Sequence, residues 1–421
     1  MNPERNKALV RHSEDMALIK RIFFNTLLTG LGVLILLNSF PVFTFAASTS
    51  DLEVAGWIPY WRDSQGIKSA KKNLNSIDII FPFAFTMQAD GSIKDLADLD
   101  GKEWKKFTKL AQKEGKKVVP TIMTSDAGTV HANLSYPDLR KKHIDNIVEM
   151  VEEGGFDGVD IDYESKFSTT KDHFSDFLTE LKDELGKGKI LACTIEARTP
   201  PVSLYKDVPK DIEAQYSNDY EVIADVCDTV EIMTYDQQRA DLKLNEKRAG
   251  APYIPVADAE WVEKVIKETL KTIPAEKIYL GLASYGRHWD VTVGPNWYKN
   301  YKNVGALNLP DMLDVAKEHK VKPVRNSAGE MGFSYLAKSS TVKFPKNLKI
   351  PKGTADGNKV AAQALAHADK TGEEVVFRFA SYSDAGAMEQ KIKLAKEYGL
   401  KGVALFKIDG EEDQKVWKIL K

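Results

Sequence analysis

Beyond residue 51 the hydrophobic positions form two alternating patterns along the chain. Some segments carry apolar residues three and four apart, as on one face of an α-helix; in 171–185, for example, Phe174, Phe177, Leu178 and Leu181 share one side. Other segments are short, dense apolar runs, which are typical of strands buried on both faces. The alternation of the two patterns predicts an α/β protein.

Eight strand-like runs can be distinguished, and helical segments separate them. The runs are Val54–Tyr60, Ile77–Phe85, Lys117–Met123, Phe156–Glu164, Lys189–Glu196, Thr229–Tyr235, Lys277–Ser284 and Gly402–Ile408. Helices are predicted over 104–114, 138–153, 171–185, 261–270 and 384–398. Eight strands alternating with helices predict a (β/α)8 TIM barrel. The competing architecture, a doubly wound open sheet, is not favoured because no Gly-rich phosphate loop follows any run.

One interval is too long to fit the alternation of strands and helices. From Arg287 to about Glu373 the chain shows mixed short segments, which predicts a small α+β domain inserted between strand seven and its following helix. A long irregular lid is the alternative, and structureless loops of such length are uncommon. The predicted parts are 1–47, an N-terminal targeting segment; 51–286, the first part of the barrel; 287–375, the insertion; and 376–421, the last part of the barrel.

The N-terminal segment has the order of a targeting signal. Lys20 and Arg21 precede an apolar run over 22–37, and small residues follow at 46–48, which predicts a signal peptide. The alternative is a membrane anchor, because the apolar stretch is long enough to span. Either way we expect the mature chain to be secreted or attached to the outer face of the membrane or cell wall. Membrane contact is expected only through this segment, if it is uncleaved.

Composition narrows the kinds of molecule that the protein is expected to bind. The net charge is −2 and there is no long basic or acidic block, so nothing suggests a nucleic-acid surface. The seven histidines are scattered without ligand spacing, and we expect neither a metal nor a cofactor. Cys193 and Cys227 are the two cysteines, so a single bridge is possible, and its formation stays open. A monomer is expected.

The fourth strand, Phe156–Glu164, has an unusual distribution of charge. Successive side chains point to opposite faces, so Asp160, Asp162 and Glu164 share one face. Carboxylates at these positions lie roughly 7 Å apart and repel by about 2.4 kcal/mol at an effective dielectric of about 20. We therefore expect at least one of them to hold a proton at pH 7, as a general acid requires. Asp157 has the opposite parity and is expected to be structural.

In a barrel of this kind the active site lies where the strands end. Glu164 ends strand four, and other strand ends carry acids, hydroxyls and aromatic rings. Such groups fit a carbohydrate site, where rings stack on sugar faces and polar groups bind hydroxyls. The candidate substrate-binding residues are Asp236, Met233, Tyr60, Phe85, Tyr285 and Phe406.

These residues carry a resemblance to a known family. Asp157-x-x-Asp160-x-Asp162-x-Glu164 resembles the signature of glycoside hydrolase family 18, the chitinase family. Met233-x-Tyr235-Asp236 is similar to that family's strand-six motif, and Tyr285-Gly286-Arg287 with the following insertion resembles its layout. The resemblance extends over 51–421. The acidic motif is highly specific, the strand-six motif moderately so.

The resemblance implies a catalytic role for each motif residue. The family's hydrolysis is retaining and uses the substrate's own 2-acetamido oxygen as nucleophile. Glu164 would be the general acid and then the base, and Asp162 would hydrogen-bond the acetamido nitrogen. Asp160 would share a proton with Asp162. Tyr235 would donate to the acetamido oxygen, and Asp236 would contact the sugar or support Tyr235.

Two departures from the family pattern affect the expected substrate. Phe406 stands where the family usually has a tryptophan beneath the central sugar, and 120–126 lacks the usual Ser-x-Gly-Gly ending of strand three. Such departures resemble the bacterial cell-wall and spore-associated branch. The expected substrates are polysaccharides or oligosaccharides containing N-acetylglucosamine, in chitin or peptidoglycan. A non-catalytic glycan-binding barrel is the alternative; the presence of Glu164 favours the enzyme, whereas Phe406 favours binding.

Overall fold

The computed structural model describes residues 52–420. The predicted signal peptide or anchor over 1–47 lies outside the described residues. Within 52–420 no helix is long and apolar enough to cross a membrane.

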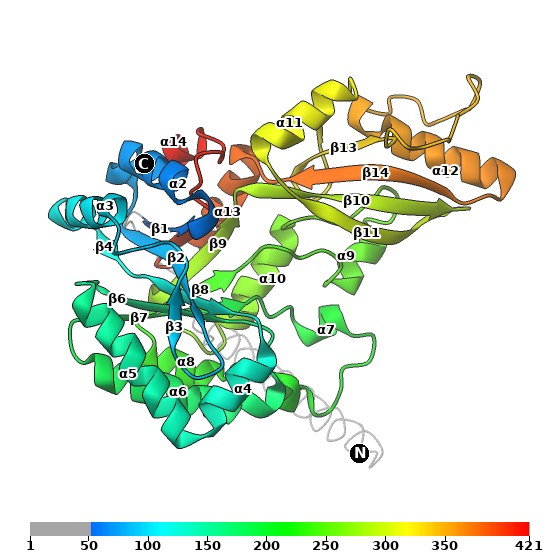
Figure 1. Ribbon diagram of the computed structural model, residues 1–421. Helices are drawn as coiled ribbons and strands as arrows, with labels where there is room; N and C mark the ends of the chain where they lie inside the picture. Colours follow the sequence, from blue (N-terminus) through cyan, green and yellow to red (C-terminus); the bar gives the residue numbers. More distant parts are fainter. Residues whose placement is uncertain (1–51, 421) are drawn as a thin grey trace, which may run out of the picture. The chain divides into compact units, whose positions relative to one another are not determined.

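A closed barrel of eight parallel strands forms the centre of this part of the chain (Figure 1). The strands are β1 (Glu53–Pro59), β2 (Ile79–Met87), β5 (Thr121–Thr124), β6 (Gly158–Tyr163), β7 (Ile190–Glu196), β8 (Thr229–Met233), β9 (Ile278–Ala283) and β15 (Gly402–Phe406). Each pairs with the next in this order, and β1 pairs with both β2 and β15, which closes the barrel. The predicted (β/α)8 barrel is confirmed.

The third predicted strand is interrupted. A short strand β4 (Lys117–Val118) pairs with β2, and β5 begins only after Pro120. Proline has no N–H to donate to a ladder, so the pairing breaks there. Strand β3 (Ile93–Asp95) adds to the other end of β2 as an antiparallel partner.

Helices cover the outside of the barrel with the faces that the sequence pattern predicts. They are α2 (Asp63–Lys72), α3 (Lys102–Lys113), α4 (Ala127–Ser135), α5 (Pro137–Glu153), α6 (Lys171–Leu185), α8 (Tyr220–Val226), α10 (Ala259–Thr269), α13 (Ala385–Glu397) and α14 (Val416–Ile419). Two short helices, α7 (Pro201–Leu204) and α9 (Leu242–Lys247), lie in the connections that follow β7 and β8. In α6 the buried residues are Phe174, Phe177, Leu178, Leu181 and Leu185. A spacing of three and four residues places them on one stripe against the strands.

Strand alternation divides the apolar residues into two cores. In β1, Ala55 and Trp57 belong to a small core inside the barrel, whereas Val54 and Ile58 belong to the large core between strands and helices. In β6, Val159 takes the outward position with Ile161 and Tyr163. The acids between them therefore point into the barrel.

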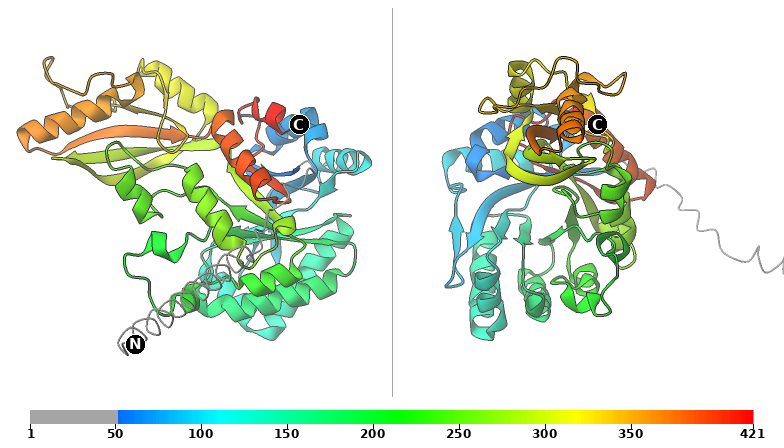
Figure 2. Two further views of the ribbon diagram at one scale, coloured as in Figure 1. Left: turned by 180° about the vertical axis from the view of Figure 1, so that it is seen from behind. Right: turned by 90° about the vertical axis from the view of Figure 1, so that its right-hand side faces the viewer.

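The insertion is a second, antiparallel sheet with two helices (Figures 1 and 2). Its strands are β10 (Tyr285–Gly294), β11 (Trp297–Asn308), β12 (Val324–Arg325), β13 (Met331–Tyr335) and β14 (Val375–Tyr382), and its helices are α11 (Leu309–Glu318) and α12 (Lys359–Thr371). The predicted α+β insertion is present. Alanines of α12 pack on β10 and β14, and Figure 2 shows the helix lying along the sheet.

The sheet of the insertion extends beyond the predicted limits of 287–375. It begins at Tyr285, because a single residue separates β9 from β10, and it ends at Tyr382. Strand β14 pairs antiparallel with β10 over eight residues, from Val375 to Tyr382, which is the partner of Gly286. Strand β14 therefore belongs to the insertion. The last part of the barrel accordingly starts at α13.

A disulfide joins Cys193 in β7 to Cys227, which lies between α8 and β8. The question that the sequence left open is thus answered by the fold, which brings the two residues together across neighbouring strands. The bridge closes a loop with a sequence separation of 34.

Removing this bridge should destabilise the protein. In the chain-entropy model a loop of this length contributes about 4 kcal/mol. We expect Cys193→Ala/Cys227→Ala to lower the free energy of unfolding by about 2–4 kcal/mol in denaturant titrations. Wild-type protein unfolded under reducing conditions should show a similar loss, and an unchanged wild-type midpoint in reductant would contradict the prediction.

Candidate active site

A cavity of about 650 Å³ opens where the barrel strands end. Its acidic lining residues are Asp162, Glu164, Glu196, Asp236 and Asp311. Its aromatic lining residues are Trp57, Trp61, Phe83, Tyr235, Trp261, Tyr285 and Phe406. The volume and the mixture of rings with a few polar groups are typical of a site for a small organic ligand.

Asp160 is the deepest of the three acids on β6 and is fully buried. Its Oδ2 accepts hydrogen bonds from Thr121 Oγ1 at 2.7 Å and Trp57 Nε1 at 3.1 Å, and its Oδ1 accepts one from Thr194 Oγ1 at 2.8 Å. Burial raises the pKa of Asp160 to about 6, and these donors oppose that rise. The donors come from the flanking strands β5 and β7 and from β1, so they also fix the side chain in place.

Asp162 has a different environment. It is 3% exposed, and its Oδ1 has no hydrogen-bond partner among the described residues. Burial raises the pKa of Asp162 well above its usual value, and the charges of Glu164 and Asp160 raise it further. Asp162 therefore holds a proton readily and has an oxygen free to bind a ligand in the cavity.

Glu164 follows the last residue of β6 and is half-buried at the cavity wall. Burial raises its pKa, and the charges of Glu196 and Asp236 add to the effect. A carboxyl group whose pKa is raised in this way, at the edge of a cavity, can act as a general acid.

Two charged residues near Glu164, Lys166 and Glu196, shift its pKa in opposite directions. Lys166 has a fully buried side chain whose Nζ donates to the Tyr163 carbonyl oxygen and lies 4.0 Å from Glu196. Burial lowers the pKa of Lys166, and the surrounding carboxylates, among them Asp162 and Glu164, raise it. Glu196 is itself held by Ser165 N at 2.8 Å and Asn218 Nδ2 at 3.0 Å.

Asp236 is fixed by the first residues of the insertion. Arg287 donates to both of its oxygens, from Nε at 2.5 Å and from Nη2 at 2.6 Å, and Tyr285 Oη donates to Oδ2 at 2.8 Å. A bidentate guanidinium–carboxylate pair is geometrically specific. It holds Asp236 beside Tyr235, which lines the same cavity.

Phe406 forms part of an aromatic cluster at the cavity. Its ring is stacked on Tyr235 with centroids 5.6 Å apart and meets Phe83 edge-on at 5.8 Å. It also contacts Trp57 at 5.9 Å and Tyr285 at 6.3 Å. Neighbouring rings therefore fix its orientation on several sides.

The structure brings most of the predicted site residues together at the cavity. Those that line it are Glu164, Asp162, Tyr235, Asp236, Met233, Tyr285 and Phe406, and Asp160 lies directly behind them. The two other predicted residues, Tyr60 and Phe85, are not among the lining residues.

The position of Phe85 outside the cavity has a clear cause in the strand. An irregularity in the pairing of β2 with β5 lies between Phe83 and Phe85, which pair with consecutive residues of β5. Such a bulge shifts the alternation by one residue. Phe83 therefore faces the cavity, and Phe85 packs in the outer core.

Tyr60 is displaced by a turn. Strand β1 ends at Pro59, and Tyr60–Arg62 form a 3-10 turn. This turn places Trp61 at the cavity, 47% exposed, whereas Tyr60 packs against both cores of the barrel. Tyr60 meets the Trp61 ring edge-on at 4.9 Å, so it supports the cavity wall from behind.

Several cavity residues were missed by the sequence reasoning. Glu196 could have been found, because it is an acid at the end of a barrel strand. Asn308 and Asp311 come from the insertion, and Lys407 follows β15. Lys407 Nζ donates to Asn308 Oδ1 at 3.0 Å, a contact across 99 residues that no local pattern indicates.

Asp157 has the structural role that its parity suggested. Its Oδ2 accepts from Val118 N at 2.9 Å and from Gln112 Nε2 at 3.1 Å, and Lys117 Nζ lies 3.0 Å from Oδ1. These bonds join the start of β6 to β4. Throughout residues 52–420 no group of three or more His, Cys, Asp or Glu side chains is arranged to hold a metal ion.

Comparison with known proteins assigns the family. The model of the glycosyl hydrolases family 18 matches residues 53–411. The chain belongs to this family and is a glycoside hydrolase. The predicted resemblance to the family, and to its bacterial cell-wall and spore-associated branch, is confirmed.

Individual relatives are distant. The chain is 24% identical over 289 residues to the uncharacterized glycosylase YvbX of Bacillus subtilis (strain 168), covering 68% of this chain and 67% of that protein. It is 23% identical over 346 residues to the cortical fragment-lytic enzyme of Bacillus anthracis, covering 80% of this chain and 66% of that protein. The chain therefore spans only about two thirds of the length of these relatives.

Among solved structures, the chain is similar to a family 18 chitinase of Cycas revoluta in complex with (GlcNAc)3. The TM-score is 0.62 at 18% identity, with 87% of this chain and 98% of that chain covered. At this identity the likeness establishes the fold alone.

Glu231 provides a test of the electrostatics in the barrel interior. It is fully buried in β8, and neither carboxyl oxygen has a hydrogen-bond partner in the part of the chain that the structure describes. Burial raises the pKa of Glu231 well above its usual value, and the charge of Asp160 adds to this. The folded protein thus binds the proton more tightly than the unfolded chain. The associated stability is complete below the unfolded pKa and is lost as pH rises toward the folded pKa.

Glu231→Gln mimics the protonated form at every pH. We expect its stability relative to wild type to increase by about 1.4 kcal/mol per pH unit from pH 5 upward, until the folded pKa is passed. Denaturant unfolding at pH 5, 6, 7 and 8 measures this slope. Glu263→Gln is the control, because the pKa of Glu263 is lowered by Lys267 and Tyr398, so its difference from wild type should stay flat above pH 6. A flat difference for Glu231→Gln would contradict the prediction.

Proposed function

We propose that this family 18 hydrolase cleaves β-1,4 linkages next to N-acetylglucosamine, in chitin oligomers or peptidoglycan, by retaining, substrate-assisted hydrolysis. The observation that carries the proposal is the arrangement of Glu164 and Asp162. One carboxyl with a raised pKa stands at the cavity wall, and a second, two residues deeper, has an oxygen free of protein partners.

In the first step Glu164 donates its proton to the glycosidic oxygen. The carbonyl oxygen of the substrate's 2-acetamido group attacks the anomeric carbon, and the bond to the leaving sugar breaks. Asp162 accepts a hydrogen bond from the acetamido N–H and offsets the positive charge of the oxazolinium ion. Tyr235 donates a hydrogen bond to the acetamido oxygen and holds it in line.

In the second step the Glu164 carboxylate takes a proton from water, and the water oxygen attacks the anomeric carbon. The acetamido group is restored, and the two displacements together retain the configuration. Asp160 supports Asp162 from below, as one pair of coupled carboxyls. Asp236, held by Arg287, supports the position of Tyr235.

The identity of the sugar polymer is the less constrained part of the proposal. The names of two similar proteins support the two substrates: the cortical fragment-lytic enzyme indicates a spore wall glycan, and the chitinase complex holds (GlcNAc)3. Both polymers occur outside the cytoplasm, in agreement with the predicted signal peptide or anchor. We propose that the chain acts there as a monomer.

Glu164→Gln tests the proposed general acid. The amide has nearly the same shape and cannot donate a proton to the leaving oxygen, so we expect kcat on a soluble N-acetylglucosamine oligomer to fall by about 10²–10⁴-fold. The dissociation constant, measured by calorimetry, should change little. Glu152→Gln on the exposed side of α5 is the matched control and should leave kcat unchanged. A Glu164→Gln enzyme with near wild-type kcat would exclude this role.

A comparison of substrates tests the reaction itself. We expect wild-type protein to release products from chitin oligomers or from peptidoglycan glycan strands, and NMR of the first product formed should show the β-anomer. Initial release of the α-anomer would contradict retention. If neither substrate is cleaved while an oligomer still binds, the chain is the alternative, a glycan-binding barrel without turnover on these substrates.

A further inference from the structure

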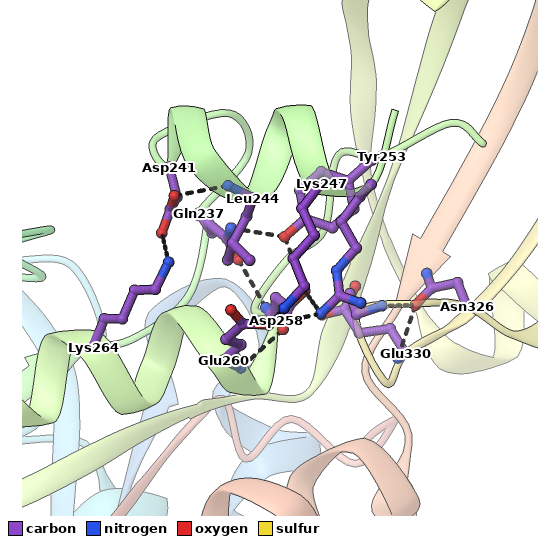
Figure 3. Close-up of polar contacts among 12 residues, drawn as sticks. Gln237, Asp241, Leu244, Lys247, Tyr253, Asp258, Glu260, Lys264, Asn326 and Glu330 are labelled. Atoms are coloured by element: carbon purple, nitrogen blue, oxygen red, sulfur yellow. Dashed lines mark hydrogen bonds and ion pairs between the residues drawn. The ribbon is translucent and has the colours of Figure 1, made fainter. Parts of the chain in front are cut away.

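A fully buried carboxylate of the insertion, Glu330, contacts a loop of the barrel. Glu330 lies outside the cavity lining, just before β13, yet its Oε1 accepts from Ala257 N at 2.7 Å and its Oε2 from Val256 N at 3.0 Å. Ser381 Oγ of β14 donates a third hydrogen bond to Oε2 at 2.7 Å. Figure 3 shows Glu330 and Asn326 beside the polar residues of that loop.

A tight turn presents Glu330 in this position. Asn326 Oδ1 accepts from the backbone N–H groups of Ala328 and Glu330, each at 3.0 Å, and Gly329 has a φ of +77°. Asn326 Nδ2 also donates to Ser381 Oγ at 3.0 Å. The turn and the neighbouring strand therefore fix the carboxylate before it meets the loop.

The loop that Glu330 holds is bonded in turn to the active site. Gln237 N donates to Val256 O at 2.9 Å, and Gln238 N donates to the Pro255 carbonyl oxygen at 3.1 Å. The side chain of Gln237 accepts from Asp258 N at 2.8 Å, a bond visible in Figure 3. Gln237 lines the cavity and follows Tyr235 by two residues.

Side-chain packing also links the segment 255–258 to the cavity. Val256 is 1% exposed and forms a small core with Ala283 and Tyr285, against which Tyr235 and Phe406 pack. A displacement of Val256 would therefore change the support of the two rings at the cavity as well as the backbone of Gln237.

The segment next to Tyr235 needs such support. Asp236 and Gln238 have φ values of +52° and +50° without being glycine. Residues with such a backbone are strained and persist where surrounding structure holds them. Arg287 holds the side chain of Asp236, and the loop over 255–258 holds the backbone after it.

Lys391 of α13 supplies charge opposite Glu330. Burial raises the pKa of Glu330, and the charge of Lys391 lowers it. Lys391 is fully buried, and its own pKa is lowered by burial and raised by Glu330, Asp258 and Asp384. The positive charge of Lys391 therefore offsets part of the cost of burying the Glu330 carboxylate.

We propose that Glu330 is a positioning residue of the active site: through it the insertion holds the segment 255–258 and, by that segment, the loop 235–238 that carries Tyr235. The insertion is then part of the apparatus that orients Tyr235, in addition to forming a wall of the cavity. The effect on turnover rests on the function proposed above, whereas the effect on the loop does not.

Glu330→Gln tests the proposal with little change in volume. Glutamine offers one carbonyl oxygen, and its NH2 group would face one of the two backbone N–H donors, so one hydrogen bond is lost. We expect amide hydrogen exchange at Gln237 and Gln238 to become at least about tenfold faster. We expect kcat on an N-acetylglucosamine oligomer to fall about 10-fold or more with KM within about twofold, because Tyr235 acts in the transition state.

Asp290→Asn is the matched control. Asp290 of β10 accepts from Arg378 Nε of β14 at 3.0 Å, so it is also a carboxylate of the insertion that holds a neighbouring strand. Among the described residues no hydrogen bond joins it to the segment 255–258 or to the turn over 326–330, and its replacement should leave the exchange of Gln237 and kcat unchanged. Ser381→Ala is a milder variant that removes one donor to Glu330, and it should shift exchange and kcat in the same direction by a smaller amount.

The outcomes separate the two proposals. Unchanged exchange and unchanged kcat in Glu330→Gln would overturn the positioning role, as would equal changes in Asp290→Asn. If Glu330→Gln does not fold, the Ser381→Ala comparison decides by the same criteria. If wild-type protein hydrolyses no glycan, the proposed function fails, and the exchange of Gln237 and Gln238 still decides whether Glu330 holds the loop.

Discussion

Repulsion among carboxylates inside the barrel is the interaction around which the rest of the site is arranged. Strand β6 points Asp160 and Asp162 into the interior, where water does not screen them, and Glu164 follows at the edge. Charged groups in such a place are stable only with donors, counter-charges or protons. Asp160 has three donors, Asp162 has a raised pKa, and Glu164 is half-exposed beside Glu196. The three acids of this stretch thus have three different environments.

The insertion contributes to the site through fixed contacts. Arg287 and Tyr285, in its first strand, hold Asp236, and Asn308 binds Lys407 at the other side of the cavity. Glu330 contacts the loop behind Gln237. These contacts couple the insertion to Tyr235, whose neighbour Asp236 has a left-handed backbone.

Local pattern was sufficient for the barrel and for the acids. Most barrel strands are dense apolar runs, and the helices between them carry a single buried stripe. The order of elements therefore follows from periodicity. The parity of Asp160, Asp162 and Glu164 follows from the pleat of one strand. The strand-end pattern did not indicate where Phe85 points, because the bulge after Phe83 depends on pairing with β5, a partner that is distant in sequence. Residues 376–382 were assigned to the last part of the barrel for the same kind of reason, since the partner of β14 in the antiparallel sheet is β10.

The sequence by itself determined the class of fold, the strand that carries the acids and the family, because those depend on periodicity and on a motif within nine residues. Only the tertiary structure decided which rings line the cavity, that Cys193 and Cys227 pair, and that Glu330 supports the loop after Tyr235. Val256 and Glu330 are 74 residues apart. Hydrogen bonds over such separations depend on how two folded units meet, and a short stretch of sequence contains no periodic signal for that.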